Sequence, residues 1–301
     1  MLPADIDIIM AMGDSLTAGF GADSTHLFNL FVDYRGSSFS VGGAKSIDEC
    51  STLANILQVY NRNITGYSTG AGEAEEKAKL NVAVTGSRSR DLLKQVHVLR
   101  DRLQAYDMKQ WKMLTIFIGS NDLCGSCFDP LNSAEHFVAN LELALDAVKM
   151  QIPFVFVSVI APPDISILKL INTTWCSVLH TFECPCFFSP GIGGTHEEYV
   201  SKLQNLIDSP KYHDDPLFNV VLQPFFEDIT IPLTPDGHPD MTFFAPDCFH
   251  FSTKAHSAAG LALWNNLMQK PKHKKTHWTI KGTSYPYPPL THSQTPSNVP
   301  S

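Results

Sequence analysis

Four short segments of the sequence hold the residues that could carry out chemistry. Ser15 lies in the turn Gly-Asp-Ser-Leu, directly after an apolar run. Gly86 in Thr-Gly-Ser and Asn121 in Gly-Ser-Asn-Asp also follow apolar runs, and Asp247 and His250 stand three residues apart near the end of the chain. A hydroxyl, an imidazole with a nearby carboxylate, and donors for a developing negative charge are the groups that ester cleavage requires.

The spacing of these residues suggests a role for each one. A serine hydroxyl is a weak nucleophile until a base accepts its proton, so His250 is the expected base for Ser15. Asp247 is close enough in sequence to hold the other imidazole nitrogen in its protonated form. The backbone N–H groups of Ser15 and Gly86 and the side-chain amide of Asn121 are the expected oxyanion hole. The missing side chain of Gly86 would let a substrate oxygen approach the backbone.

Other residues compete for these roles. Asp122 and Asp164 are alternative partners for His250, and the glycine and asparagine turns, taken alone, are typical of ordinary loops. The segment Gly-Tyr-Ser-Thr-Gly also places Ser68 in the G-x-S-x-G pattern of another hydrolase class. That pattern needs a strand directly before the serine, whereas the polar residues before Ser68 predict a loop. We favour Ser15 because its partners occur together in a workable order.

Alternating strands and helices would position these residues. Continuous apolar runs predict five buried strands, at 6–12, 79–85, 113–119, 154–161 and 218–224. Apolar residues at helical spacing predict helices within 90–106, 133–150 and 252–269, with Ser133 and Ser252 as N-caps of the last two. This alternation predicts a three-layer α/β/α sandwich with a mostly parallel sheet, and functional groups at the carboxyl ends of its strands.

The composition is that of an ordinary globular protein, with 44% hydrophobic and 17% charged residues among 301. Lys and Arg number 22 against 30 Asp and Glu, for a formal net charge of −8, so nucleic acid is not an expected partner. The basic segment 270–275 is expected to be a solvated linker, with weak attraction to anionic lipid as the alternative. The Pro-, Ser- and Thr-rich residues that follow complete a tail, 271–301, that we predict to be disordered.

Cysteines and glycosylation sequons indicate an oxidising, extracellular or cell-surface setting. The sequons begin at Asn63 and Asn172, and the seven cysteines imply structural disulfides with one thiol left over. Cys124 and Cys127 have the spacing of a redox or zinc pair, but no second regular pair completes a zinc site. A bond between these two cysteines would stiffen the loop after Asn121, and the pairing of the others stays open.

The beginning of the chain disagrees with a secretory signal, because two aspartates interrupt the first apolar stretch. The longest apolar run elsewhere is too short to cross a membrane. The chain is therefore expected to be a domain from a longer precursor, or an incomplete gene product, without a signal peptide or membrane anchor of its own.

The four segments resemble the signature blocks of the GDSL or SGNH hydrolases. The resemblance implies that Ser15 is the catalytic serine, His250 the base, and Gly86 and Asn121 oxyanion residues. It also implies a flavodoxin-like SGNH hydrolase fold for a catalytic domain at residues 1–270. Three further stretches are similar to the phospholipase B branch, at 33–43, 64–72 and 121–127. That branch cleaves acyl esters of phospholipids and lysophospholipids, and some of its members act on neutral glycerides and retinyl esters.

The expected function is a serine esterase that forms an acyl-enzyme on Ser15 and needs no metal or organic cofactor. Its expected partners are a phospholipid, lysophospholipid or other acyl ester, and transiently a lipid aggregate or membrane surface. An esterase or thioesterase for short acyl or carbohydrate acetyl esters is the alternative, because the blocks specify the reaction and not the alcohol. A lipid-binding module that keeps the fold without catalysis is the non-enzyme alternative.

Overall fold

The centre of the molecule is a parallel β-sheet. The computed structural model describes residues 2–171, 173–213 and 215–278. Across the sheet, in order, the strands are β1 (Ile8–Gly13), β2 (Lys112–Phe117), β3 (Val155–Ile160) and β4 (Phe218–Gln223). All neighbouring strands are parallel, with Gly13 beside Phe117 and Phe117 beside Ile160 at their last pairs. The carboxyl ends of the strands therefore meet at one edge, as the sequence predicts.

The predicted strand at 79–85 runs beside β1 but is not a regular strand. Ala11 donates its N–H to the carbonyl of Leu80 and accepts from the N–H of Val82, each at 3.0 Å, around a single parallel bridge. The first half of β1 is already bonded to Thr65, so only its second half is left for this segment. If this segment is counted as an edge strand and all five strands are numbered along the chain, their order across the sheet is 2-1-3-4-5, as in flavodoxin-like sheets.

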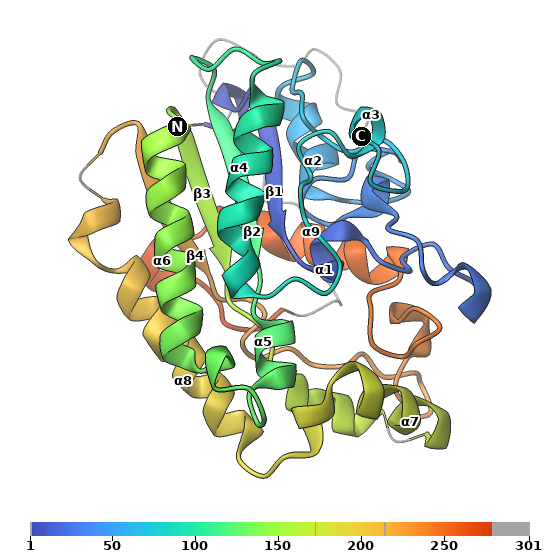
Figure 1. Ribbon diagram of the computed structural model, residues 1–301. Helices are drawn as coiled ribbons and strands as arrows, with labels where there is room; N and C mark the ends of the chain where they lie inside the picture. The colour runs from blue at the N-terminus through green and yellow to red at the C-terminus, as the bar shows by residue number, and fades with distance from the viewer. Residues whose placement is uncertain (1, 172, 214, 279–301) are drawn as a thin grey trace.

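Helices cover both faces of the sheet. One face carries α4 (Leu92–Leu103), α6 (Ala134–Gln151) and α8 (Ile192–Ile207), and the other carries α2 (Leu53–Tyr60) and α9 (Thr253–Leu267). In Figure 1, α4 and α6 lie in front of the sheet and α9 behind it. The predicted N-caps are confirmed, because Ser133 accepts from the N–H of His136 and Ser252 from that of Ala255. The three-layer sandwich is likewise confirmed.

Short helices lie at the carboxyl edge of the sheet. They include α1 (Ser15–Ala18) after β1, α5 (Ser120–Gly125) after β2, and α7 (Thr174–Glu183). Figure 1 shows α5 and α7 below the ends of the strands, while α3 (Glu75–Ala78) lies elsewhere, before the edge segment. Within the described ranges, no helix has both the length and the apolar character needed to span a bilayer.

The chain after α9 packs back onto the domain. Thr276 Oγ1 donates to Asp228 Oδ2 at 2.5 Å, and Trp278 is only 6% exposed. The prediction of a disordered tail is therefore wrong for residues 271–278. The polar composition of the tail obscured the one large aromatic side chain that anchors this stretch in the core. The rest of the predicted tail, 279–301, lies outside the described residues.

Three disulfides lie at the carboxyl edge. They join Cys124 to Cys184, Cys127 to Cys186, and Cys176 to Cys248, while Cys50 is a buried free thiol. One thiol is left over, as predicted, but the expected Cys124–Cys127 bond is wrong. The two cysteines follow each other along α5 and its end, and each is bonded to the segment after α7 instead of to the other. Three disulfides indicate folding in an oxidising compartment.

Candidate active site

Hydrogen bonds join Ser15, His250 and Asp247 in a chain. Ser15 Oγ lies 2.9 Å from His250 Nε2, and His250 Nδ1 lies 2.7 Å from Asp247 Oδ2. The backbone N–H groups of Phe249 and His250 both donate to Asp247 Oδ1 at 3.0 Å. The Asp247 carboxylate is fully buried and bonded at both oxygens, so it holds the imidazole in one orientation. This arrangement can move a proton from the serine hydroxyl to the imidazole.

The end of β1 delivers Ser15 to this position. Ser15 is the first residue of α1, and Asp14 caps that helix by accepting from the N–H of Leu16 at 3.0 Å. Gly13 makes the turn from strand to helix with φ of +153°, and a Cβ there would lie 2.2 Å from the carbonyl oxygen of Phe117. Only glycine fits this turn, because both the backbone conformation and the space exclude a side chain.

The turn that carries Asp247 and His250 is tied to α7. Cys248 adopts a left-handed conformation with φ of +64°, and its disulfide to Cys176 joins the turn to α7. His180, also in α7, has its Nε2 2.9 Å from the carbonyl oxygen of Cys248. On the other side, the ring of Phe20 packs against His250 with centroids 4.7 Å apart. These contacts hold Cys248 in a backbone conformation that a non-glycine residue rarely adopts.

Two of the predicted oxyanion residues, Ser15 and Asn121, follow strand ends, and Gly86 follows the segment 79–85 beside β1. Asn121 Nδ2 donates to the carbonyl oxygen of Ser87 at 2.9 Å, which uses one of the two N–H bonds of the amide. Ser15 begins α1, so its N–H has no partner within the helix. Gly86 is exposed with φ of +81°, and no atom lies within 4 Å of where its Cβ would be. Backbone conformation, and not crowding, therefore explains the glycine.

Gln95 connects these turns, and it is not among the site residues predicted from the sequence. Its Oε1 accepts from the N–H of Gly13 and its Nε2 donates to the carbonyl of Gly13, both at 2.8 Å. Nε2 also lies 3.1 Å from Ser87 Oγ. Gln95 is 3% exposed and lies on the core-facing side of α4, beside Val96. A polar residue on the apolar face of a helix is the signal that could have identified it.

The competing residues have other partners. Asp122 accepts from both the backbone N–H and the hydroxyl of Ser89, and Asp164 accepts from the same two groups of Ser166. The hydroxyl of Ser68 is fully buried and donates to a backbone carbonyl. The structure therefore places none of the three in the Ser15–His250 hydrogen-bond chain.

Burial and hydrogen bonds set the charges around the site. Burial opposes ionisation of Asp247, but the hydrogen bond and positive charge of His250 and the backbone donors hold the pKa of Asp247 below its usual value. Burial raises the pKa of Asp14 to about 7. Burial and the negative charge of Asp247 raise the pKa of Glu183 to about 8. Asp247 is thus the ionised carboxylate that His250 faces.

Glu183 stands close to this pair. Ligand atoms of Glu183, Asp247 and His250 all lie within 4.8 Å of one another, a set that could accept a divalent cation. A cation there would compete with the hydrogen bonds that Asp247 and His250 make in the chain with Ser15. No sequence pattern predicts the position of Glu183, because it ends α7 far from Asp247 in sequence and reaches it only through tertiary packing.

Comparison with known proteins places this geometry in a family. The model of the GDSL-like lipase/acylhydrolase family matches residues 9–263. Membrane-associated phospholipase B1 of Mus musculus is 40% identical over 298 aligned residues, and that of Homo sapiens is 38% identical over 294. Each alignment covers 91% of this chain and 20% of the relative, so the chain spans about a fifth of the length of these curated relatives.

A solved structure from Parabacteroides merdae, described as a GDSL-like lipase, is 16% identical with a TM-score of 0.43, covering 86% of this chain and 95% of its own. Family membership rests instead on the sequence match, which runs from within β1 to within α9 and includes Ser15, Asn121 and His250. The chain belongs to the GDSL-like lipase/acylhydrolase family.

Proposed function

We propose that this chain is a serine esterase that cleaves acyl esters through an acyl-enzyme on Ser15. The hydrogen-bonded chain from Ser15 through His250 to Asp247 carries the proposal. His250 accepts the hydroxyl proton as Ser15 Oγ attacks the ester carbon, and then gives that proton to the leaving alcohol. Water next attacks the acyl-enzyme with His250 again as base, which releases the acid and restores Ser15.

The oxyanion of each tetrahedral intermediate is bound by the N–H groups of Ser15 and Gly86 and by the second N–H of Asn121. The bond from Asn121 to the carbonyl of Ser87 supports this role, because it fixes the amide before substrate arrives. A donor already held in place costs no reorganisation when charge develops. Asp247 stays ionised and stabilises the imidazolium that forms on His250.

The substrates we propose are phospholipids and lysophospholipids. The names of the two mammalian relatives, both phospholipase B1, support this substrate class. Family membership supports the reaction, acyl ester hydrolysis, and leaves the alcohol to be determined.

Exposed aromatic residues next to the site support transient contact with a lipid surface. Phe28 is 96% exposed and Phe31 is 81% exposed. The ring of Phe31 lies 6.1 Å from that of Phe20, which in turn packs on His250. Apolar side chains that protrude from the rim of a site can enter the boundary between headgroups and acyl chains, and so bring an ester within reach.

We also propose an extracellular or cell-surface location. The three disulfides support an oxidising compartment, and the relatives are described as membrane-associated. Asn63, in the first sequon, is exposed and available to a glycan. Asn172, the asparagine of the second sequon, lies outside the described residues.

A comparison of Ser15→Ala with Ser68→Ala tests the proposed function. Ser15→Ala should abolish ester hydrolysis and labelling by a fluorophosphonate, because both need the activated hydroxyl. Ser68→Ala should leave the label in place, since that hydroxyl is buried in a backbone contact. Unchanged hydrolysis in Ser15→Ala would overturn the proposal.

A substrate panel then separates the classes of ester. Phospholipid and lysophospholipid should be hydrolysed faster than acetyl esters or thioesters. Turnover of acetyl esters alone would favour the short-chain esterase, and lipid binding without any turnover or labelling would favour a non-catalytic module.

A further inference from the structure

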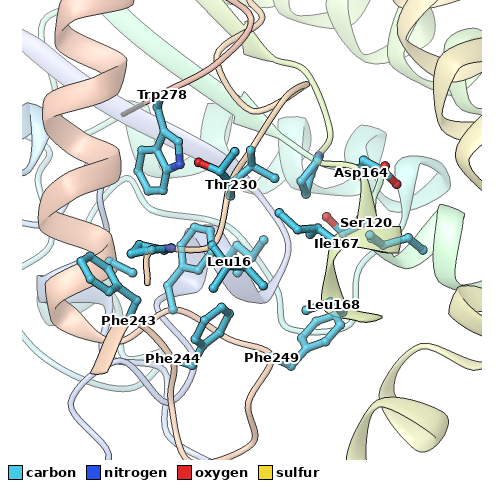
Figure 2. A pocket seen from close by; sticks show the side chains of 17 residues that line it. Leu16, Ser120, Asp164, Ile167, Leu168, Thr230, Phe243, Phe244, Phe249 and Trp278 are labelled. Carbon is cyan, nitrogen blue, oxygen red and sulfur yellow. The ribbon is translucent and has the colours of Figure 1, made fainter. Parts of the chain in front are cut away.

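An apolar cavity lies beside the candidate active site. Its lining includes residues next in sequence to the site residues: Leu16 follows Ser15, and Phe249 and Phe251 flank His250. Figure 2 shows these side chains around a common space, with Trp278 at the end of the group opposite Phe249 in this view. The cavity thus lies next to the reacting groups, with the sequence neighbours of Ser15 and His250 in its wall.

The apolar lining of the cavity favours an apolar ligand. The walls are almost wholly hydrocarbon, including Ile167, Leu168 and Phe243. Asp164 is the one carboxylate among the lining residues, and both of its oxygens are bonded to Ser166. A polar ligand would therefore lose its hydration without gaining partners, whereas a hydrocarbon chain would be stabilised by leaving water.

The size of the cavity fits part of an acyl chain. Its volume is about 70 Å³. A single water-sized group needs roughly 10–15 Å³ of such volume, so the cavity admits about five to seven groups of that size. A short run of methylenes fills such a space, and a longer chain needs the far end to open.

Trp278 lines the cavity on the side away from Phe249 (Figure 2). It comes from the segment after α9, beyond the residues that match the family model. Its ring packs against Phe226 at 5.2 Å and Phe251 at 6.4 Å between centroids. The hydrogen bond from Thr276 to Asp228 fixes the chain just before it. Trp278 is thus held in the aromatic core that borders the cavity.

We propose that this cavity binds the acyl chain of the ester and that Trp278 sets the chain length it accepts. The inference rests on the proposed function, because it places the acyl group on Ser15. A segment beyond the residues matched by the family model would then determine specificity, while the matched residues supply the reaction.

Two opposite variants test the chain-length role on soluble esters from acetate to dodecanoate. Trp278→Ala deepens the cavity, and Ile167→Trp fills it from a half-buried position. Each buried methylene is worth about tenfold or more in specificity. We therefore expect Trp278→Ala to shift the kcat/KM ratio of dodecanoate to butyrate upward by roughly tenfold, and Ile167→Trp to shift it downward by a similar factor.

Trp111→Ala is the matched control, because Trp111 precedes β2 at the opposite edge of the sheet. It should leave the chain-length profile unchanged. If the profile is the same in Trp278→Ala and Ile167→Trp as in the parent, while hydrolysis still depends on Ser15, the inference is wrong and the proposed function stands.

A binding measurement tests the cavity without turnover. In Ser15→Ala protein, a bromine-labelled decanoate should quench the fluorescence of Trp278. The fraction of fluorescence that is quenched should be smaller in the double variant Ser15→Ala, Trp278→Ala. It should be unchanged in the double variant Ser15→Ala, Trp111→Ala. Equal quenching in the two double variants would overturn the inference, whereas absence of hydrolysis in the parent would count against the proposed function alone.

Discussion

The side-chain amide of Gln95 is hydrogen-bonded to both backbone groups of Gly13, the residue two positions before Ser15. This contact fixes the end of β1 from the helix that covers it. The same amide reaches Ser87 Oγ, so one side chain from α4 holds two of the turns that form the candidate site.

Replacing Gln95 by leucine should therefore damage both stability and turnover. The N–H of Gly13 would be left buried without its partner, at a cost of about 1–3 kcal/mol, whereas the C=O would keep its bond from the N–H of Val84. Ser15 would lose its fixed position, so kcat should fall more than KM rises. Denaturant unfolding and steady-state kinetics measure the two effects. Gln104→Leu, at the exposed end of α4, is the control and should change neither.

Asn121→Ala separates an oxyanion donor from a turn residue. Loss of the donor should lower kcat on the order of 10² to 10³ fold, with fluorophosphonate labelling less affected because Ser15 and His250 remain. The thermal midpoint should fall only slightly, because a single partly exposed hydrogen bond to Ser87 is lost. Near-normal turnover together with a much lower midpoint would assign Asn121 a structural role alone.

Asp247→Asn tests the orientation of the base. An amide cannot hold His250 Nδ1 in the protonated form that the carboxylate selects, so kcat should fall on the order of 10⁴ fold while KM changes little. Asp164→Asn is the matched control, because both oxygens of Asp164 are bonded to Ser166 and neither is bonded to His250. A severe defect in Asp164→Asn with a mild one in Asp247→Asn would reverse the assignment.

Glu183→Gln should change how stability depends on pH. The pKa of Glu183 is raised from its ordinary 4.5 to about 8, so the folded protein keeps a proton that the unfolded chain has already released. Stability from this group is therefore present below pH 4.5 and is lost as pH rises toward 8. Glutamine cannot ionise and avoids that loss.

The thermal midpoint of Glu183→Gln, relative to the parent, should be higher at pH 9 than at pH 5. Exposed Glu76 gives the control variant Glu76→Gln, for which the difference from the parent should be the same at both values. An equal difference at pH 5 and pH 9 in Glu183→Gln would contradict the assigned burial of the carboxyl.

Local patterns predicted most of the fold. A strand buried on both faces leaves a continuous apolar run, and the helix faces of α4 and α6 leave apolar residues at regular spacing. The segment 79–85 is not the regular strand that its apolar run predicts, because Thr65 occupies part of the edge of β1. Competition between segments distant in sequence cannot be read from a local apolar pattern.

The candidate site was predictable only where each residue sits in a short motif of its own. Gln95 and Glu183 belong to helices. Gln95 reaches Gly13 through packing between layers, and Glu183 reaches Asp247 through the link between α7 and the turn bearing Asp247 and His250. Trp278 was missed for a related reason, because one aromatic residue in a polar stretch has no periodicity to reveal its burial.

The disulfides also constrain the turn bearing Asp247 and His250. The six bonded cysteines lie at the edge that carries Ser15, and within the described residues no disulfide lies at the opposite ends of the strands. Without the bond between Cys176 and Cys248, the turn bearing Asp247 and His250 would lose its covalent link to α7 and keep the contact of His180 with the Cys248 carbonyl. We therefore expect the geometry of this turn to depend on oxidation more strongly than the sheet does.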